Sequence, residues 1–230
     1  MPRGRPRRKG PRSDFSGDLF SGELTCDSLS FERSARASGF TSIAGVDEAG
    51  RGPLAGPVVA AAVVLPEGLL IPGLTDSKQV PEEERERLFE VVRSQAVCYG
   101  IGIANERTID DVNILQATLI AMERALQQLS PQPDYLLLDA VTLPRVPLPQ
   151  KPLIHGDCRS HSIAAASILA KVTRDRLMLE LHERFPQYHF HKHKGYGTKE
   201  HLSLLRKHGP CEAHRKSFQP VARMLKGETR

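Results

Sequence analysis

The feature that most constrains the fold is the alternation of short apolar segments with longer segments of helical periodicity between residues 41 and 185. Short runs of Val, Ala, Leu or Ile are typical of buried strands, whereas apolar residues at three- and four-residue steps are typical of amphipathic helices. The predicted strands are 42–46, 57–65, 96–104, 135–138 and 153–154, and the predicted helices are 81–94, 109–129 and 160–185. This alternation predicts an α/β fold. The short turn at 50–56 suits a hairpin and therefore predicts a mixed sheet.

The chain divides into three parts by composition. Residues 1–40 are rich in Arg, Pro, Gly and Ser, which predicts a basic, disordered leader with a short helix near 30–37. Residues 41–185 are predicted to form the core of the domain, and residues 186–230 a basic loop and C-terminal helices that complete the same domain. The net charge of +5 divides into +6 for residues 1–12, +7 for 186–230 and −8 for the rest. This distribution predicts an acidic centre between segments that attract phosphate.

The sequence favours an intracellular protein that does not enter a membrane. The longest apolar run, 58–65, is too short to cross a bilayer, and the basic N-terminus lacks the apolar stretch of a secretory signal. We therefore expect a cytoplasmic location. The four cysteines are scattered, which predicts reduced thiols. Cys211 and His214 have the spacing of half a zinc site, but no second half follows.

Acidic residues follow three of the predicted strands directly. Asp47 and Glu48 come after IAGV, Asp139 comes after YLLL, and Asp157 comes after LIHG. In open α/β sheets the carboxyl ends of strands form the edge where ligands bind, so these side chains converge if the strands are neighbours. Clustered carboxylates repel one another unless a cation neutralises them, and their oxygens select Mg²⁺ or Mn²⁺. The pattern predicts a site for two such ions that serves phosphoryl chemistry.

Another interpretation exists for each of these acids. A single Asp at a strand end commonly caps a turn or a helix, although three such positions make this less convincing as a general explanation. A geometric objection applies to the adjacent pair. Because neighbouring side chains of a strand face opposite ways, Asp47 and Glu48 cannot both face one pair of ions unless the chain turns there or a backbone carbonyl assists.

Several other residues have features that suit nucleic-acid binding. The turn contains Gly50, Arg51 and Gly52, where glycines allow close approach of backbone amides and the guanidinium can bind phosphate, although a tight hairpin would also use them. Lys78 lies in a polar loop where it can contact phosphate. Basic and aromatic residues alternate in 188–197, which favours a nucleic-acid backbone over zinc. Lys171 and Arg174 suit either phosphate contact or a solvated surface, and the small residues at 164–167 suit a helix face packed on the sheet.

The sequence also resembles a known family, the bacterial ribonucleases HII of the type 2 ribonuclease H class. The resemblance rests on six motifs in family order, which are IAGVDEAGRGPLAGP at 43–57, LTDSK at 74–78, LDA at 138–140, SIAAASILAKVTRD at 162–175, HKGYGT at 193–198 and HRKSF at 214–218. It covers nearly all of the chain outside the leader. Two features depart from the family pattern: His155 stands where the family usually has a lysine, and the leader is longer than expected.

The resemblance implies a ribonuclease H-like fold, with a mixed five-stranded sheet flanked by helices and a helical C-terminal part. It implies that Asp47, Glu48, Asp139 and Asp157 form the catalytic metal site for two Mn²⁺ or Mg²⁺ ions. It further implies that Gly50, Arg51 and Gly52 bind the ribose 2′-hydroxyl, that Tyr196 packs on the sugar, and that Lys78 and Lys194 contact the substrate. A group that binds the 2′-hydroxyl is needed to distinguish RNA from DNA.

We therefore expect an endoribonuclease that cuts the RNA strand of RNA–DNA hybrids, and cuts 5′ of single ribonucleotides in duplex DNA, as a monomer. Two alternatives compete with this hypothesis. One is a junction resolvase or integrase of the same fold, which would need no 2′-hydroxyl contact. The other is a non-catalytic nucleic-acid-binding module, which would depend on salt but need no divalent ion.

Overall fold

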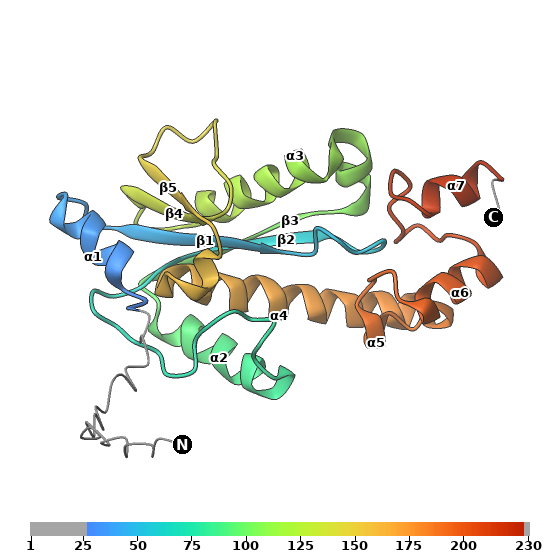
Figure 1. Ribbon diagram of the computed structural model, residues 1–230, viewed down its shortest axis with the longest axis horizontal. Helices are drawn as coiled ribbons and strands as arrows, with labels where there is room; N and C mark the ends of the chain where they lie inside the picture. Colours follow the sequence, from blue (N-terminus) through green and yellow to red (C-terminus); the bar gives the residue numbers. More distant parts are fainter. Residues whose placement is uncertain (1–26, 228–230) are drawn as a thin grey trace, which may run out of the picture.

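The computed structural model describes residues 27–227, which form a five-stranded sheet covered by helices on both faces (Figure 1). The strand order is β3-β2-β1-β4-β5. The strands are β1 (Ile43–Ala49), β2 (Val58–Val64), β3 (Cys98–Ala104), β4 (Tyr135–Asp139) and β5 (Gln150–Leu153). Pairs β1–β2 and β2–β3 are antiparallel, whereas β1–β4 and β4–β5 are parallel. The predicted mixed α/β sheet is therefore confirmed.

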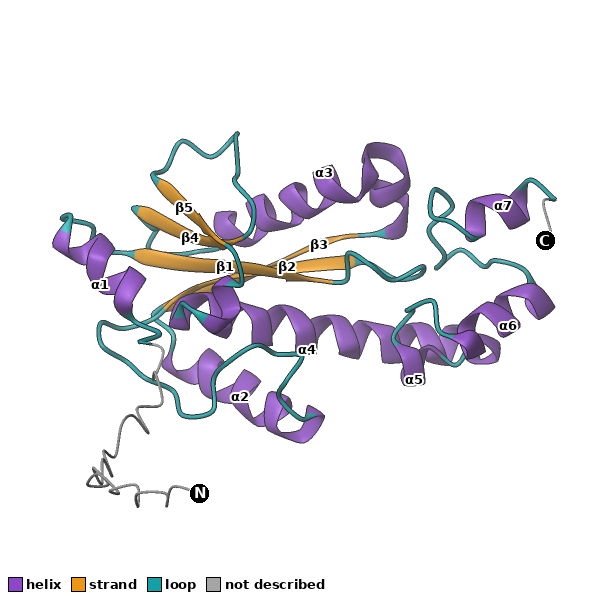
Figure 2. Cartoon of the chain, in the orientation of Figure 1, coloured by secondary structure: helices purple, strands orange, loops and turns teal. Residues whose placement is uncertain are grey.

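The helices pack in two layers around this sheet (Figure 2). Helix α3 (Glu106–Gln127) covers one face, and α2 (Glu82–Gln95) and α4 (His161–Arg184) cover the other. The shorter helices are α1 (Ser30–Ala37), α5 (Phe190–His193), α6 (Lys199–His208) and α7 (Val221–Leu225), with 3₁₀ turns η1 (Gly156–Cys158) and η2 (Pro186–Tyr188). Within residues 27–227 no helix combines the length and apolar character that a bilayer crossing requires.

The central strand lies unusually close to α4. At Gly45 in β1, an added Cβ atom would lie 2.1 Å from the main-chain carbon of Ser162 in α4. The residues of the 164–167 run are all buried in this contact, so their interpretation as a tightly packed helix face is confirmed. Small side chains here bring the polar residues of α4 close to the end of β1.

Local sequence signals mark the starts of the three long helices. Pro81 precedes α2, whose first turn carries three glutamates that interact favourably with the helix dipole. Asn105 accepts a hydrogen bond from Thr108 N–H at the start of α3, and Ser160 accepts one from Ile163 N–H at the start of α4. Three expectations about extent differ from the structure. Strand β1 continues through Asp47 and Glu48, β5 ends at Leu153, and the predicted loop at 188–197 contains α5.

The N-terminal part of the chain is described from residue 27 onward. The predicted basic leader lies mainly at 1–26, outside the described residues, as does Cys26. The helix expected near 30–37 is present as α1, and it packs on the body of the molecule through Glu32 and Ala35, which are both buried. The division into leader, core and C-terminal part stays a prediction.

Candidate active site

The predicted acidic residues gather at one end of the two central parallel strands. Val46 of β1 is in register with Leu138 of β4, so Asp47 and Asp139 follow at the same level of neighbouring strands. Asp157 lies in η1, just after β5. The Gly156 N–H donates a 2.7 Å hydrogen bond to Asp139 Oδ1, which holds this turn against the end of β4. Parallel pairing therefore brings together three acids that are distant in the sequence.

The carboxylates of β1 are held in conditions that disfavour their charge. Asp47 is buried, and burial, followed by repulsion from Glu48 and Asp139, raises its pKa well above the usual value. Burial also raises the pKa of Glu48, although the Arg51 guanidinium, 3.3 Å from Glu48 Oε1, opposes the rise. Glu48 Oε2 is buried and has no hydrogen-bond partner within the described residues. The positive charge of Arg51 thus compensates only part of the cost of burying these two carboxylates.

The loop before α2 adds a lysine and another acid to this cluster. Burial lowers the pKa of Lys78, but attraction to Asp76, Asp157, Asp47 and Asp139 outweighs it and raises that pKa. Burial, followed by repulsion from Asp76 and Asp139, raises the pKa of Asp157. Asp76 lies beside Asp157 and accepts the Lys78 N–H at 2.9 Å. The ammonium of Lys78 is thus surrounded by acids.

The donor chemistry of the cluster fits a hard divalent cation. It supplies only carboxylate oxygens, three of its acids have raised pKa values, and Glu48 Oε2 is unpartnered, as expected where positive charge is needed. In the structure itself, no three Asp, Glu, His or Cys side chains among residues 27–227 are spaced to hold one ion. Asp47 and Glu48 are neighbours in β1, and neighbouring side chains of a strand face opposite ways. The objection that both cannot face one pair of ions therefore still applies.

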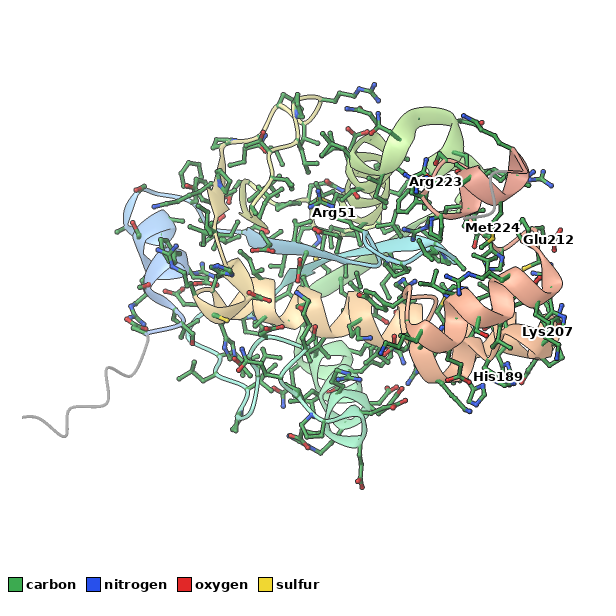
Figure 3. The ribbon with its side chains drawn as sticks, turned by 45° about the vertical axis from the view of Figure 1, so that its right-hand side comes forward. Arg51, His189, Lys207, Glu212, Arg223 and Met224 are labelled. Atoms are coloured by element: carbon green, nitrogen blue, oxygen red, sulfur yellow. The ribbon has the colours of Figure 1, made fainter. Side chains whose placement is uncertain are left out.

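A pocket of about 180 Å³ opens beside the acids. It is lined by Glu48, by 50–52 of the β1–β2 turn, by Ser77 and Lys78, by polar residues of α4 and by Tyr196. An added Cβ atom on Gly52 would lie 3.7 Å from Tyr196 Cε1, so the turn and the aromatic ring are neighbours across this pocket. The Arg51 side chain is exposed beside the sheet (Figure 3). The pocket therefore brings Glu48, one of the four acids, together with the residues predicted to contact a ribose.

Comparison with known proteins identifies the family. The model of the family "Ribonuclease HII" matches residues 44–221. Ribonuclease HII of Ruminiclostridium cellulolyticum is 60% identical over 190 residues, which are 83% of this chain and 74% of that protein. The chain belongs to the ribonuclease HII family. It is accordingly a ribonuclease H enzyme, and the alternative of a non-catalytic binding module is not supported.

Solved structures of ribonucleases H2 and HIII share the fold of this chain. The crystal structure of ribonuclease H2 from Pyrococcus horikoshii OT3 has a TM-score of 0.69 and 25% identity, and the match covers 82% of this chain and 99% of that chain. The structure of Bst-RNase HIII in complex with Mn²⁺ has a TM-score of 0.59 and 16% identity, over 82% and 70% of the two chains. The expected ribonuclease H-like fold is therefore confirmed.

Two predicted substrate residues of this ribonuclease HII, Tyr196 and Lys194, have different surroundings in the structure. Tyr196 lines the pocket, whereas the Lys194 ammonium lies 4.0 Å from Glu82 at the start of α2. Arg174 is not a surface residue, because it is buried and bonded to main-chain carbonyls. It also lines the pocket, so its contact with phosphate stays a prediction. His155 adopts the left-handed conformation (φ 54°) two residues before Asp157.

Sequence reasoning missed a pair of serines in the site. Ser167 of α4 donates a 2.8 Å hydrogen bond to Ser77 Oγ, and both side chains are buried. Against the larger effect of burial, the Ser167 hydroxyl also lowers the pKa of Asp47. Its only sequence signal was that it is the one polar residue in an alanine run. The Cys211–His214 pair, weighed as half a zinc site, is instead joined by a hydrogen bond from Cys211 N–H to His214 Nδ1 at 3.0 Å.

Proposed function

We propose that this ribonuclease H hydrolyses the RNA strand of RNA–DNA hybrids and also cuts 5′ of single ribonucleotides embedded in duplex DNA. The observation that carries the proposal is the position of the pocket. Its lining includes Glu48 of the acidic cluster together with the 50–52 turn and Tyr196, and Asp139 ends the neighbouring strand β4. A phosphodiester at the acids would thus have its neighbouring ribose beside groups that can sense a 2′-hydroxyl.

Asp47, Glu48, Asp139 and Asp157 are proposed to hold two divalent cations, Mn²⁺ or Mg²⁺. When bound, such ions offset the repulsion among the carboxylates and stabilise the charge of an in-line displacement at phosphorus. The Asp139 carboxylate holds Gly156 and thereby orients the turn that carries Asp157. The Ser77–Ser167 hydrogen bond links the Lys78 loop to α4 near the predicted ligands.

The remaining residues are proposed to bind and orient the duplex. Arg51 is exposed enough to bind a phosphate with two parallel hydrogen bonds once it releases Glu48. The half-exposed ring of Tyr196 offers a flat apolar surface for a sugar. The C-terminal part supplies phosphate contacts through exposed basic residues such as Lys207 and Arg223, which lie on α6 and α7 in Figure 3. One site and one duplex need no second copy, so we propose a monomer of 25.4 kDa.

A cleavage assay tests this function. A labelled DNA duplex with one ribonucleotide and the same duplex without it are incubated with Mn²⁺, with Mg²⁺ and with EDTA. We expect one cut, 5′ of the ribonucleotide, that leaves a 5′-phosphate and disappears with EDTA or with the all-DNA duplex. Asp139→Asn should lower the rate roughly 100- to 1000-fold or more while duplex binding remains. Cutting of the all-DNA duplex would instead favour a resolvase-like enzyme.

A further inference from the structure

Two buried arginines lie under the turn that lines the pocket. Arg174 and Arg215 have exposed fractions of 1% and 0%. Neither takes part in any ion pair found among residues 27–227; their guanidinium groups donate hydrogen bonds to main-chain carbonyls. A buried charge without a carboxylate partner is costly, so its retention requires many satisfied hydrogen bonds.

Arg215 holds consecutive peptide groups of the turn. Its Nη2 donates to Gly50 O at 2.5 Å and to Pro57 O at 3.2 Å, its Nη1 donates to Arg51 O at 3.0 Å, and its Nε donates to Gly56 O at 2.9 Å. Arg174 supports the same turn from α4 through the carbonyls of Pro57, Ala55 and Lys194. The two guanidinium groups thus fix both arms of the turn.

The bonds of Arg215 determine where two N–H groups point. In a trans peptide the C=O and the N–H of the same group face opposite directions. The carbonyl of Gly50 shares a peptide group with the N–H of Arg51, and the carbonyl of Arg51 shares one with the N–H of Gly52. Because both carbonyls converge on one guanidinium, both N–H groups point away from it. Neither N–H has a hydrogen-bond partner within the described part of the chain.

The surroundings make this arrangement rigid. An added Cβ atom on Gly50, where φ is +99°, would lie 2.1 Å from Arg174 Nε, so only glycine fits over the arginine. The segment that carries Arg215 is itself fixed, because Arg215 N–H bonds Leu54 O at 2.8 Å. Asp110 of α3 accepts the N–H groups of Lys216 and Ser217. Gly50, Arg51 and Gly52 line the pocket and Arg215 does not, so the turn separates this arginine from the pocket.

We propose that Arg215 is a positioning residue for ribose recognition: it aims the N–H groups of Arg51 and Gly52 into the pocket, where they bind the oxygen of a 2′-hydroxyl. This inference rests on the proposed function. The buried positive charge also favours partial negative charge on that oxygen. Lysine cannot replace the arginine, because an ammonium lacks the planar fork that reaches two carbonyls in fixed directions.

The test measures discrimination between two duplexes in the cleavage-deficient Asp139→Asn protein with Mg²⁺. Its readout is the dissociation constant of an all-DNA duplex divided by that of the same duplex with one ribonucleotide. We expect this ratio to be well above one in the Asp139→Asn protein. Adding Arg215→Lys should lower the ratio roughly 30-fold, or to one if it starts below that value, because two hydrogen bonds are lost. Affinity for the all-DNA duplex should stay unchanged.

Two further variants separate positioning from stability. Asp134→Asn weakens the bonds that Asp134 accepts from Thr41 and Ser42 far from the turn, so it should lower the melting temperature and leave the ratio intact. Gly52→Pro removes one N–H without changing Arg215, so it should lower the ratio about fivefold. The double variant Gly52→Pro with Arg215→Lys should lower the ratio by less than the two single effects combined. If Arg215→Lys fails to fold, an unchanged ratio in Gly52→Pro overturns the proposal.

The outcomes distinguish this proposal from the proposed function. If the Asp139→Asn protein shows no preference for the ribonucleotide duplex, both are wrong. If that preference exists and Arg215→Lys keeps it, the proposed function stands and the role of Arg215 is wrong. A ratio lost equally in Asp134→Asn would show that the effect follows stability, and would also overturn the role.

Discussion

Asp47 lowers the stability of the folded protein and is a predicted ligand of the catalytic metal ions. It is buried next to Glu48 and Asp139, and burial and repulsion raise its pKa well above the ordinary value. A carboxyl with a raised pKa in the folded state binds its proton more tightly there than in the unfolded chain. Stability therefore falls as pH rises from the ordinary value of 3.8 through the raised pKa, and the cost is fully present above it.

We predict that Asp47→Asn abolishes cleavage and makes the protein more stable at neutral pH in EDTA. The gain should be about 1.4 kcal/mol for each pH unit by which the pKa is raised. Thermal melting with EDTA measures it. Mn²⁺ should raise the melting temperature of the unchanged protein and raise that of the variant less, because one ligand is lost. A variant that melts lower in EDTA and gains as much from Mn²⁺ would show that Asp47 is not a ligand.

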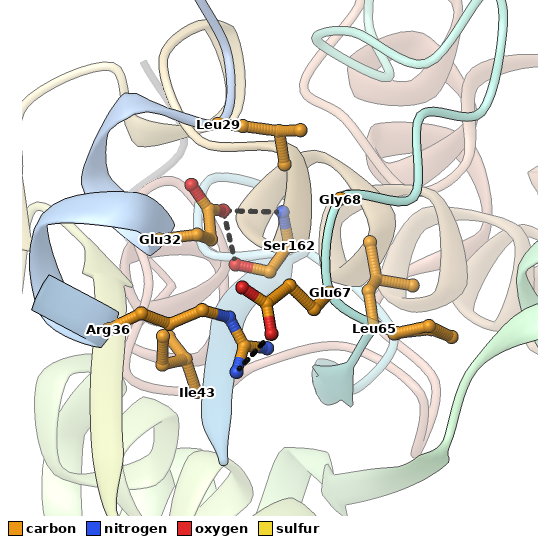
Figure 4. A pocket seen from close by; sticks show the side chains of 9 residues that line it. Leu29, Glu32, Arg36, Ile43, Leu65, Glu67, Gly68 and Ser162 are labelled. Atoms are coloured by element: carbon orange, nitrogen blue, oxygen red, sulfur yellow. Dashed lines mark hydrogen bonds and ion pairs between the residues drawn. The ribbon is translucent and has the colours of Figure 1, made fainter. Parts of the chain in front are cut away.

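Helix α1 contributes an acid to the start of α4. Glu32 Oε1 accepts hydrogen bonds from Ser160 Oγ (2.6 Å), Ser162 N–H (3.0 Å) and Ser162 Oγ (2.7 Å), as Figure 4 shows for Ser162. A carboxylate at this position also interacts favourably with the positive end of the helix dipole. Ser160 N–H in turn bonds Gly156 O, next to Asp157. The contact therefore connects α1 to the turn that carries a predicted ligand.

We predict that Glu32→Ala lowers the free energy of unfolding by roughly 2–4 kcal/mol, because three bonds to a buried carboxylate are lost together. Urea denaturation measures the change. Glu32 and Glu67 both line a second, small pocket between α1 and the start of α4 (Figure 4). Glu67→Ala provides the control, because Glu67 is exposed and its only ion pair in the described part of the chain is with Arg36 at 3.7 Å. It should cost less than about 1 kcal/mol. Equal losses in the two variants would contradict the role given to Glu32.

These contacts also explain what the sequence could and could not predict. Apolar periodicity and caps are local, so they placed the strands and helices and put Asp47 and Asp139 at strand ends. The motif resemblance supplied the fold and the family, both of which are confirmed. Glu32 and Ser160 are 128 residues apart, and the bonds of Arg215 to the turn span about 160 residues. No local pattern distinguishes such a buried arginine from one on the surface, and for that reason the interpretation of Arg174 as a solvated surface residue was wrong.

At the scale of the whole molecule, the C-terminal part is held together by a chain of neutral histidines that ends at the pocket residue Tyr196. Cys211 N–H donates to His214 Nδ1, so the other ring nitrogen of His214 must carry the proton. That nitrogen lies 3.1 Å from His201 Nε2 and donates to it, and His201 Nδ1 then donates to Tyr196 O at 2.8 Å. This order requires both rings to be uncharged. It fixes the main chain at Tyr196, which lines the proposed ribose pocket.

Acid should therefore weaken this connection. Burial lowers the pKa of both His201 and His214 from 6.5 to about 4. The unfolded chain thus binds more protons between these values, so stability is complete above pH 6.5 and is lost as pH falls towards 4. At pH 5 the loss should be on the order of 2 kcal/mol for each ring. Carboxyls with raised pKa values, such as Asp47, act in the opposite direction, so only a comparison of variants isolates the histidines.

We predict that His201→Gln with His214→Gln destabilises the protein at pH 7.5 but much less at pH 5, because the glutamines take up no proton. Urea denaturation at the two pH values measures the difference. His208→Gln, at an exposed histidine of α6, should keep the full pH dependence. Ribonucleotide cleavage by the unchanged protein at pH 5 should fall together with its stability, since Tyr196 depends on the same chain. If the double variant keeps the full pH dependence, the two rings do not cause it, and the prediction is wrong.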